Sequence, residues 1–242
     1  MSISPRVMRT GLLVGEQGIQ ALQQATVMIV GVGAVGGYAL EAVARSGVGH
    51  IIVVDFDKFD ETNINRQILA LSSTIGRKKV DVATERIKEI NPNCVVEAKD
   101  ILVSRETLPT LLDTKVDMVV DAIDSLNAKC CLIEELVRRN IPFISSMGAA
   151  LKTKTEHIKI ASLDKTVNCS LSRLVRQRLR RRETDISKVK CVYSDEPAQQ
   201  QAILSSDTAG ERNTLGSLPT ITAIFGLTIA NEVIKTLVNK GK

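Results

Sequence analysis

The chain has 242 residues, of which 44% are hydrophobic and 24% charged, so it can bury one substantial core as an ordinary globular protein. Five scattered cysteines without a CxxC pair, and no apolar signal stretch near residue 1, argue against a disulfide-stapled secreted protein. We therefore expect a cytoplasmic location. The net charge of +5 comes from one segment, because residues 151–191 hold twelve Lys/Arg against four Asp/Glu, whereas the rest holds 20 against 23.

Residues 1–150 alternate short apolar runs with helical patterns. The runs are nearly continuous in Val, Ile and Met, which is typical of strands covered on both faces. The pattern predicts strands at 26–30, 51–55, 95–99, 118–121 and 143–145, and helices at 35–46, 79–90, 105–113 and 128–139. Such repeated units predict an α/β fold with a doubly wound, mostly parallel, Rossmann-like sheet.

Residues 151–242 follow a different pattern, which predicts an α+β extension integrated into the same domain. In chain order it predicts a strand at 157–162, an arginine-rich helix at 170–182, a strand at 190–193, a mobile polar loop at 195–213 and a last helix at 219–238. The uncharged run at 213–231 approaches the length of a membrane span. Its Asn, Ser, Pro and Thr residues favour a buried helix instead, so we expect no membrane role.

A glycine turn, Gly31-Val32-Gly33-Ala34-Val35-Gly36, follows the first strand and opens the first helix. Its glycines let backbone N–H groups approach phosphate, and the helix N-terminus adds partial positive charge. Asp55 ends the next strand, where a ribose-binding carboxylate belongs. Taken alone, this pattern predicts a nucleotide site, with NAD as the first ligand to consider.

The charged residues downstream of Asp55 do not suit a dehydrogenase, because hydride transfer needs no cluster of cations. Arg66 and Lys79 are expected at the same edge of the sheet as Asp124, which follows the fourth strand. Cationic side chains stabilise charge on phosphoryl oxygens, and a carboxylate can hold Mg²⁺. Each residue alone could form a surface salt bridge, but the set predicts chemistry at a phosphate.

Taken together, the glycine turn and these charged residues make the first 150 residues resemble the ubiquitin-activating-enzyme-like adenylyltransferases, the superfamily of ThiF and MoeB. The matching pieces are GVGAVG, DFD, TNINRQ, the G-x-x-K of Gly76–Lys79, INP and DAIDS. The resemblance implies ATP and Mg²⁺ in place of NAD. It also implies that a substrate carboxylate attacks the α-phosphate, giving an acyl-adenylate and pyrophosphate.

The same resemblance implies a role for each matching residue. The phosphates would be held by Gly31, Gly33, Gly36, Asn63, Arg66 and Lys79, and the ribose by Asp55, with Asp57 beside it. Asp124 would organise the metal, and Ser125 and Asn127 would lie near the adenine. The stretch RVMRTGLLVG resembles the family's N-terminal arm, which implies a homodimer. Arg9, or alternatively Arg6, would then enter the partner's ATP site, making Arg66, Lys79, Asp124 and Arg9 the catalytic set.

The zinc ligands of the sulfur-carrier activators in this superfamily are missing. Two CxxC pairs usually supply them. Here Lys188 occupies one position of the first pair and no cysteine follows Cys191, so we expect no zinc. The pieces HIKIASLDKT and KCVYSDE resemble the tRNA threonylcarbamoyladenosine dehydratase branch. That resemblance implies ATP-dependent ring closure on the modified adenosine. The alternative is activation of the C-terminus of a ubiquitin-like sulfur carrier.

The basic segment and the last cysteine each have two interpretations. The arginine-rich helix is either a solvated face or a surface for tRNA phosphates, the second carried by Arg173, Arg176, Arg180, Arg181 and Arg182. Cys191 is either a nucleophile or a packed strand residue. As a nucleophile, with its pKa lowered by the flanking Lys188 and Lys190, it would accept the acyl group, or a persulfide from a sulfur-transfer partner. We favour packing for Cys191, because the implied ring closure requires no protein nucleophile.

Overall fold

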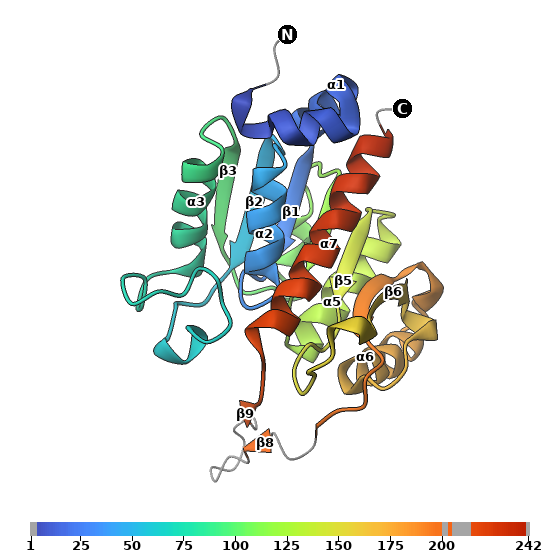
Figure 1. Cartoon of the computed structure of the whole chain (residues 1–242). Coiled ribbons are helices and arrows are strands. Elements are labelled where there is room, and N and C mark those ends of the chain that lie inside the picture. Colours follow the sequence, from blue (N-terminus) through green and yellow to red (C-terminus); the bar gives the residue numbers. More distant parts are fainter. Residues whose placement is uncertain (1–3, 200–202, 205–213, 241–242) are drawn as a thin grey trace.

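The computed structural model describes residues 4–199, 203–204 and 214–240. A seven-stranded sheet forms its centre, in the order β3-β2-β1-β4-β5-β7-β6 (Figure 1). The strands are β1 (Thr26–Val30), β2 (His50–Asp55), β3 (Val95–Asp100), β4 (Met118–Asp121), β5 (Phe143–Ser146), β6 (Ile158–Ser162) and β7 (Lys190–Ser194). All neighbouring strands pair in parallel except β6, which runs antiparallel to β7 at the edge. The predicted doubly wound, mostly parallel sheet is confirmed.

Alternating side chains of the central strands feed two cores. In β1, Val27 and Ile29 belong to one buried cluster, and Met28 and Val30 belong to the other. All four are at most 1% exposed, as expected for a strand covered on both faces. The continuous apolar runs of the sequence therefore reflect a sheet with helices on each side.

Seven helices flank this sheet within the described residues. They are α1 (Met8–Gln24), α2 (Gly36–Arg45), α3 (Lys79–Ile90), α4 (Leu108–Leu111), α5 (Leu126–Arg138), α6 (Ser170–Arg180) and α7 (Pro219–Lys240). Figure 1 shows α2 and α7 over one face, with α5 behind the sheet. A Cβ added to Gly226 of α7 would lie 2.4 Å from the carbonyl oxygen of Val35, so α2 and α7 are in close contact there.

Several predicted elements differ from the observed ones. Helix α1 was not predicted, because Gly11, Gly15 and Gly18 lower helix propensity; Gly15 (φ +79°) interrupts the helix. Helix α4 is one turn rather than the predicted 105–113, and α6 ends at Arg180, short of the predicted 182. The predicted loop at 195–213 contains β8 (Ile203–Leu204), which pairs with β9 (Thr214–Leu215). Its residues 200–202 and 205–213 lie outside the described residues.

Helix α7 is long and apolar enough to cross a membrane by length and composition, as the uncharged sequence run suggested. No other helix in the described ranges meets that test. Half of its most apolar 18-residue stretch is buried within the fold, where α7 packs on α2 and α1. Phe225, Ile229 and Val233 of this helix belong to the larger core cluster, so α7 has the contacts expected of a core helix.

Candidate nucleotide site

The two turns that follow β1 and β4 meet at the point where the strand order of the sheet reverses. The chain runs from β1 outwards through β2 and β3, and then returns to place β4 on the other side of β1. In doubly wound sheets, ligands bind at the carboxyl ends of the strands at this switch point. A Cβ added to Gly31 (φ +88°) would lie only 2.8 Å from the carbonyl oxygen of Ala122. The glycine turn therefore packs directly on the turn that carries Asp124.

The glycines of this turn serve different purposes. A Cβ on Gly36 would lie 1.8 Å from the carbonyl oxygen of Gly31, so no other residue fits where α2 begins. A Cβ on Gly33 would meet only the Gln67 side chain, at an ordinary 3.7 Å. The protein itself does not require glycine at position 33. The space left there suits a group from outside, such as a phosphate that approaches the backbone.

Asp55 fixes the glycine turn from the end of β2. Its Oδ2 accepts a hydrogen bond from the Val32 N–H at 2.8 Å, and its Oδ1 accepts one from the Asp57 N–H at 2.9 Å. The residue is only 9% exposed. Each carboxylate oxygen can still accept a further hydrogen bond, so Asp55 can also receive hydroxyl donors such as those of a ribose.

Lys79 and Asp57, both predicted at the site, form an ion pair. The Lys79 Nζ lies 3.0 Å from Asp57 Oδ2, with 8% of the lysine side chain and 49% of the aspartate side chain exposed. Lys79 is the first residue of α3, and its ammonium lies 6.0 Å from the centre of the Phe59 ring. An ammonium has three donors, so Lys79 can bind a phosphate oxygen while it remains held by Asp57.

Arg66 and Asn63 lie in the loop between β2 and α3, where both have local structural contacts. The Arg66 Nη1 donates to the Thr62 carbonyl and to Asn65 Oδ1, both at 2.8 Å. Asn63 Oδ1 accepts from the Asp60 N–H at 3.3 Å as part of a capping box. Within the described ranges, no hydrogen bond or ion pair joins either residue to the other predicted ligands. The remaining guanidinium N–H groups of Arg66 are available to a ligand.

The sequence pattern assigns no role to Gln67, although this residue directly follows Arg66 in TNINRQ. It is 7% exposed, it lies against Gly33, and its Oε1 has no hydrogen-bond partner among the described residues. A buried polar atom without a partner costs free energy unless something outside the chain supplies one. Gln67 therefore belongs with the candidate ligands of this site.

Asp124 is exposed and has no partner within the described part of the chain. Asp121, the last residue of β4, holds the turn that carries Asp124, because its Oδ1 accepts a hydrogen bond from the Ile123 N–H at 3.1 Å. The other oxygen of Asp121 accepts from Lys129 Nζ and from Ser145 Oγ, both at 2.6 Å. No group of three or more His, Cys, Asp or Glu side chains in the described ranges is arranged to hold a metal.

The helix that follows this turn presents the two residues predicted near adenine. Ser125 is the N-cap residue of α5, and Asn127 lies in the first turn of that helix. The Asn127 side chain is exposed, and its Oδ1 accepts a hydrogen bond from Arg178 Nη1 of α6 at 3.1 Å. The predicted nucleotide edge and the arginine-rich helix are therefore in direct contact.

Arg9 and Arg6 lie far from the glycine turn of their own chain. Figure 1 shows α1 across one end of the sheet and the loop between β2 and α3 at the opposite end. A five-residue parallel strand such as β1 spans about 16 Å, so α1 is separated from the switch point by at least the length of a strand. Arg9 is exposed and has no partner among the described residues. Its side chain is therefore not part of the nucleotide site of its own chain.

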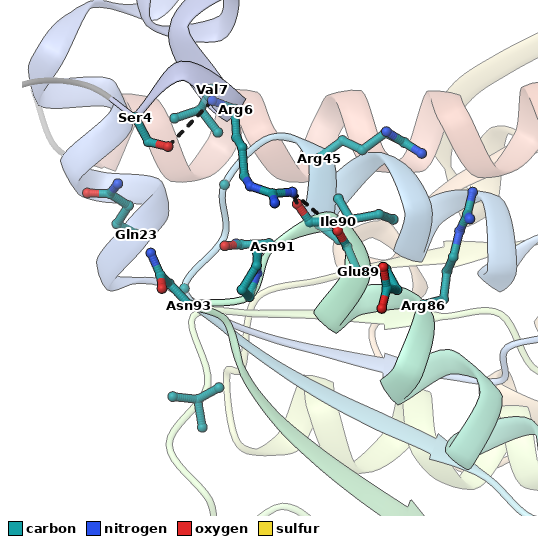
Figure 2. A pocket seen from close by; sticks show the side chains of 15 residues that line it. Ser4, Arg6, Val7, Gln23, Arg45, Arg86, Glu89, Ile90, Asn91 and Asn93 are labelled. Carbon is teal, nitrogen blue, oxygen red and sulfur yellow. Dashed lines mark hydrogen bonds between the residues drawn. The ribbon is translucent and has the colours of Figure 1, made fainter.

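Arg6 instead closes the end of α3 in its own chain. Its Nη1 donates to two carbonyl oxygens at the end of that helix, at 3.2 and 3.0 Å (Figure 2). Arg6 also lines a cavity of about 890 Å³ at the amino ends of β2 and β3. Arg45 and Arg86 line it too, and both donate to Glu41 at 2.8 Å, so one carboxylate holds both guanidinium groups. This cavity is separate from the switch point.

The five arginines predicted to bind tRNA fall into two groups in the structure. Three are exposed and have no partner among the described residues: Arg173, Arg180 and Arg181. The other two face inward. Arg176 Nη1 donates to the Thr166 carbonyl at 2.7 Å, and Arg182 Nη1 lies 2.9 Å from Glu134 Oε2. Arginine spacing in the sequence could not separate these groups.

Cys191 is fully buried in β7. Burial raises the pKa of its thiol to about 12, and its Sγ donates to the Ala161 carbonyl at 3.4 Å. Lys190, expected to lower that pKa, pairs with Glu232 at 2.7 Å on the surface. A thiol that is protonated and enclosed is a poor nucleophile, which supports the packing interpretation.

Comparison with known proteins gives matches along most of the chain. The ThiF family model matches residues 6–242. The tRNA threonylcarbamoyladenosine dehydratase of Bacillus subtilis is 44% identical over 188 residues, covering 78% of this chain and 74% of that protein. The enzyme of the same name from Haemophilus influenzae is 36% identical over 95% of this chain and 92% of its own. The crystal structure of E. coli tRNA N6-threonylcarbamoyladenosine dehydratase, TcdA, in complex with ATP superposes with a TM-score of 0.88 at 32% identity, covering 99% and 98% of the two chains.

Proposed function

This chain belongs to the ThiF family, and from that premise we propose that it uses ATP to cyclise threonylcarbamoyladenosine in tRNA with loss of water. Relatives named for that reaction align along most of the chain. The observation that carries the proposal is the contact between the glycine turn and the turn of Asp124 at the switch point. Together with Lys79 and Arg66, that edge holds the charges that adenylation requires.

The reaction proceeds in two steps. The threonyl carboxylate attacks the α-phosphate of ATP, pyrophosphate leaves, and an acyl-adenylate forms. The neighbouring carbamoyl group then attacks the activated carbonyl, a five-membered ring closes, and AMP leaves. Because both reacting groups belong to one nucleoside, proximity supplies much of the rate. No protein nucleophile is needed, in keeping with the enclosed thiol of Cys191.

The chain's own residues bind and stabilise charge in this scheme. The backbone at Gly33, with Gln67 beside it, receives the phosphates, and Asp55 receives the ribose hydroxyls. Lys79 and Arg66 stabilise the charge that accumulates on the phosphoryl oxygens. Ser125 and Asn127 lie beside the adenine.

Asp124 fits a magnesium site. Mg²⁺ usually binds one or two carboxylates together with substrate phosphates, and Asp124 is an exposed carboxylate without an intrachain partner in the described ranges. When bound there, Mg²⁺ would neutralise charge on the leaving pyrophosphate. We expect no zinc, because Lys188 and the lack of cysteines after Cys191 remove the CxxC ligands.

We propose a cytoplasmic homodimer that binds tRNA through the outward arginines of α6. Arg9 would complete the ATP site of the partner, since α1 lies at the far end of its own sheet. Leu12 and Leu13 of α1 are 83% and 87% exposed, and a partner chain would cover such an apolar pair. A sulfur-transfer partner stays a prediction, and the buried Cys191 does not favour it.

Release of AMP and pyrophosphate tests the proposal. Both products should form from ATP only when tRNA carries the threonylcarbamoyl group, because that group supplies the attacking carboxylate. Equal release with unmodified tRNA would contradict the proposal. ATP–pyrophosphate exchange stimulated by a sulfur carrier ending in Gly-Gly would instead favour the alternative function.

A further inference from the structure

One contact joins the arginine-rich helix to the nucleotide edge. Arg178 Nη1 of α6 donates to Asn127 Oδ1 of α5 at 3.1 Å. Arg178 is half-buried, unlike Arg180 two residues later, which is exposed. Arg182, in the turn that follows α6, pairs with Glu134 of α5 at 2.9 Å. The end of α6 and this turn therefore face α5, and both arginines are directed toward protein groups.

The contact fixes the orientation of the Asn127 amide. A guanidinium group carries only donors, so the Asn127 atom that faces it must be the oxygen. The amide assignment, which is often ambiguous, is settled here by the chemistry of the partner. The Nδ2 group has no partner among the described residues and keeps two donors free.

We infer that Arg178 is a positioning residue for the nucleotide site, which holds the Asn127 amide so that its NH₂ group can donate to the base of the bound nucleotide. The inference rests on the proposed function, in which Asn127 lies beside adenine. The ring nitrogens N1, N3 and N7 of adenine are acceptors, so an amide NH₂ group is a suitable partner. Arg178 acts through Asn127 and does not itself touch the nucleotide.

The placement of Asn127 explains why it needs such support. The side chain is exposed, and the first turn of a helix does not by itself fix an asparagine rotamer. The glycine turn packs on the turn that precedes α5, so the start of this helix borders the switch point. A side chain held from the neighbouring helix binds a ligand with less loss of conformational entropy than a free one.

The test is a double-mutant cycle on AMP affinity, measured by calorimetry on the full chain without tRNA. R178A and N127A should each weaken AMP binding by about 3- to 10-fold, the range for one hydrogen bond lost. The double variant should bind no more weakly than N127A, because Arg178 acts only through that amide. R138A, the matched control, removes an exposed arginine of α5, the helix that carries Asn127, and should bind AMP as the wild type does. The inference fails if R178A also matches the wild type, or if its loss adds fully to that of N127A.

Two conservative variants separate positioning from folding. N127D keeps an oxygen for Arg178 but replaces the donor NH₂ group, so it should keep the wild-type melting temperature and lose AMP affinity as N127A does. R178K keeps a donor-only group and should recover part of the affinity lost in R178A. Wild-type AMP affinity in N127D would overturn the inference.

Failure of the proposed function would be visible separately. A chain that released no AMP with threonylcarbamoyl tRNA, yet lost AMP affinity in R178A and N127D, would contradict the reaction and support the positioning role. If the wild-type chain cyclised the nucleoside while R178A and N127D bound AMP normally, the reaction would be supported and the positioning role contradicted.

Discussion

Lys129 and Asp121 form an ion pair that solvent does not reach. The Lys129 Nζ lies 2.6 Å from Asp121 Oδ2, and neither side chain has any exposed surface. Ser145 donates to the same carboxylate oxygen, and the second oxygen of Asp121 accepts the N–H of Ile123. The pair thus links α5, β4 and β5 directly beneath the turn that presents Asp124.

Removing one partner of this pair should unfold the protein more easily. K129M leaves the Asp121 carboxylate buried without its cation, and breaking a buried pair in this way costs about 3–5 kcal/mol. K190M is the matched control, because Lys190 forms its pair with Glu232 at the surface and half of its side chain is exposed. Urea unfolding measures both free energies. A K129M variant as stable as K190M would show that the buried pair does not hold this turn.

Two glycines of the same turn should respond differently to alanine. G36A places a Cβ 1.8 Å from the Gly31 carbonyl oxygen and should lower the melting temperature sharply. G33A meets only Gln67 at 3.7 Å, so its melting temperature should stay near that of the wild type. Its AMP affinity should nevertheless fall by roughly tenfold or more, because a hydrogen bond to a charged phosphate is worth about 1.5–3 kcal/mol. If G33A binds AMP normally, phosphate does not occupy the space at Gly33.

The two groups of arginines on α6 should differ in tRNA binding. R173A, R180A and R181A remove outward charges, and each should reduce the slope of log affinity against log salt by about one. R176A should change that slope little and should lower the unfolding free energy instead, because Arg176 holds the Thr166 carbonyl. Filter binding over a range of salt concentrations measures the slopes. A wild-type slope for R173A, R180A and R181A would mean that the outward face does not bind the RNA backbone.

Glu196 should make stability depend on acid pH. Burial opposes ionisation, but hydrogen bonds from the N–H groups of Lys154 and Thr153 and from the Thr153 hydroxyl lower the pKa of Glu196 to about 2. The unfolded chain binds this proton near its ordinary pKa of about 4.3. The folded carboxylate therefore adds stability above that pH, and this contribution is lost as pH falls toward 2.

The variant that tests this is E196Q, with E156Q, an exposed glutamate of the same region, as its control. Between pH 5 and pH 2, the unfolding free energy of the wild type should fall more steeply than that of E196Q. The E156Q curve should follow the wild type. Parallel curves for the wild type and E196Q would rule out the lowered pKa as a source of stability.

The sequence predicted those parts of the fold that follow from short-range periodicity. Strands β1, β2 and β4 appear as nearly continuous apolar runs, and α3 begins and ends at the predicted residues. Helix α1 escaped prediction because three glycines interrupt its pattern. Strands β6 and β7 of the extension were also found, but the pairing of β7 with β5, and of β6 with β7, is a long-range property.

The placement of candidate site residues was predictable where a residue type and its position at the end of an element can be recognised. Asp55, Lys79 and Asp124 each follow or open an element at the carboxyl edge, which can be recognised in the sequence alone. The burial of Gln67 and the contact between Arg178 and Asn127 could not be predicted. The latter residues are 51 positions apart and meet only because α5 packs on α6.

The central claim is ring closure on threonylcarbamoyladenosine, and mass spectrometry of tRNA nucleosides tests it most directly. Modified tRNA is incubated with the chain and ATP, and the nucleosides are then analysed, with K79A and K78A in parallel. Lys78 pairs with Asp100 at 2.7 Å and is half exposed, so K78A is a control for loss of a neighbouring charge. The account predicts that the modified nucleoside loses the mass of one water with the wild type and K78A, and far more slowly with K79A. An unchanged nucleoside mass with the wild-type chain and ATP would contradict it.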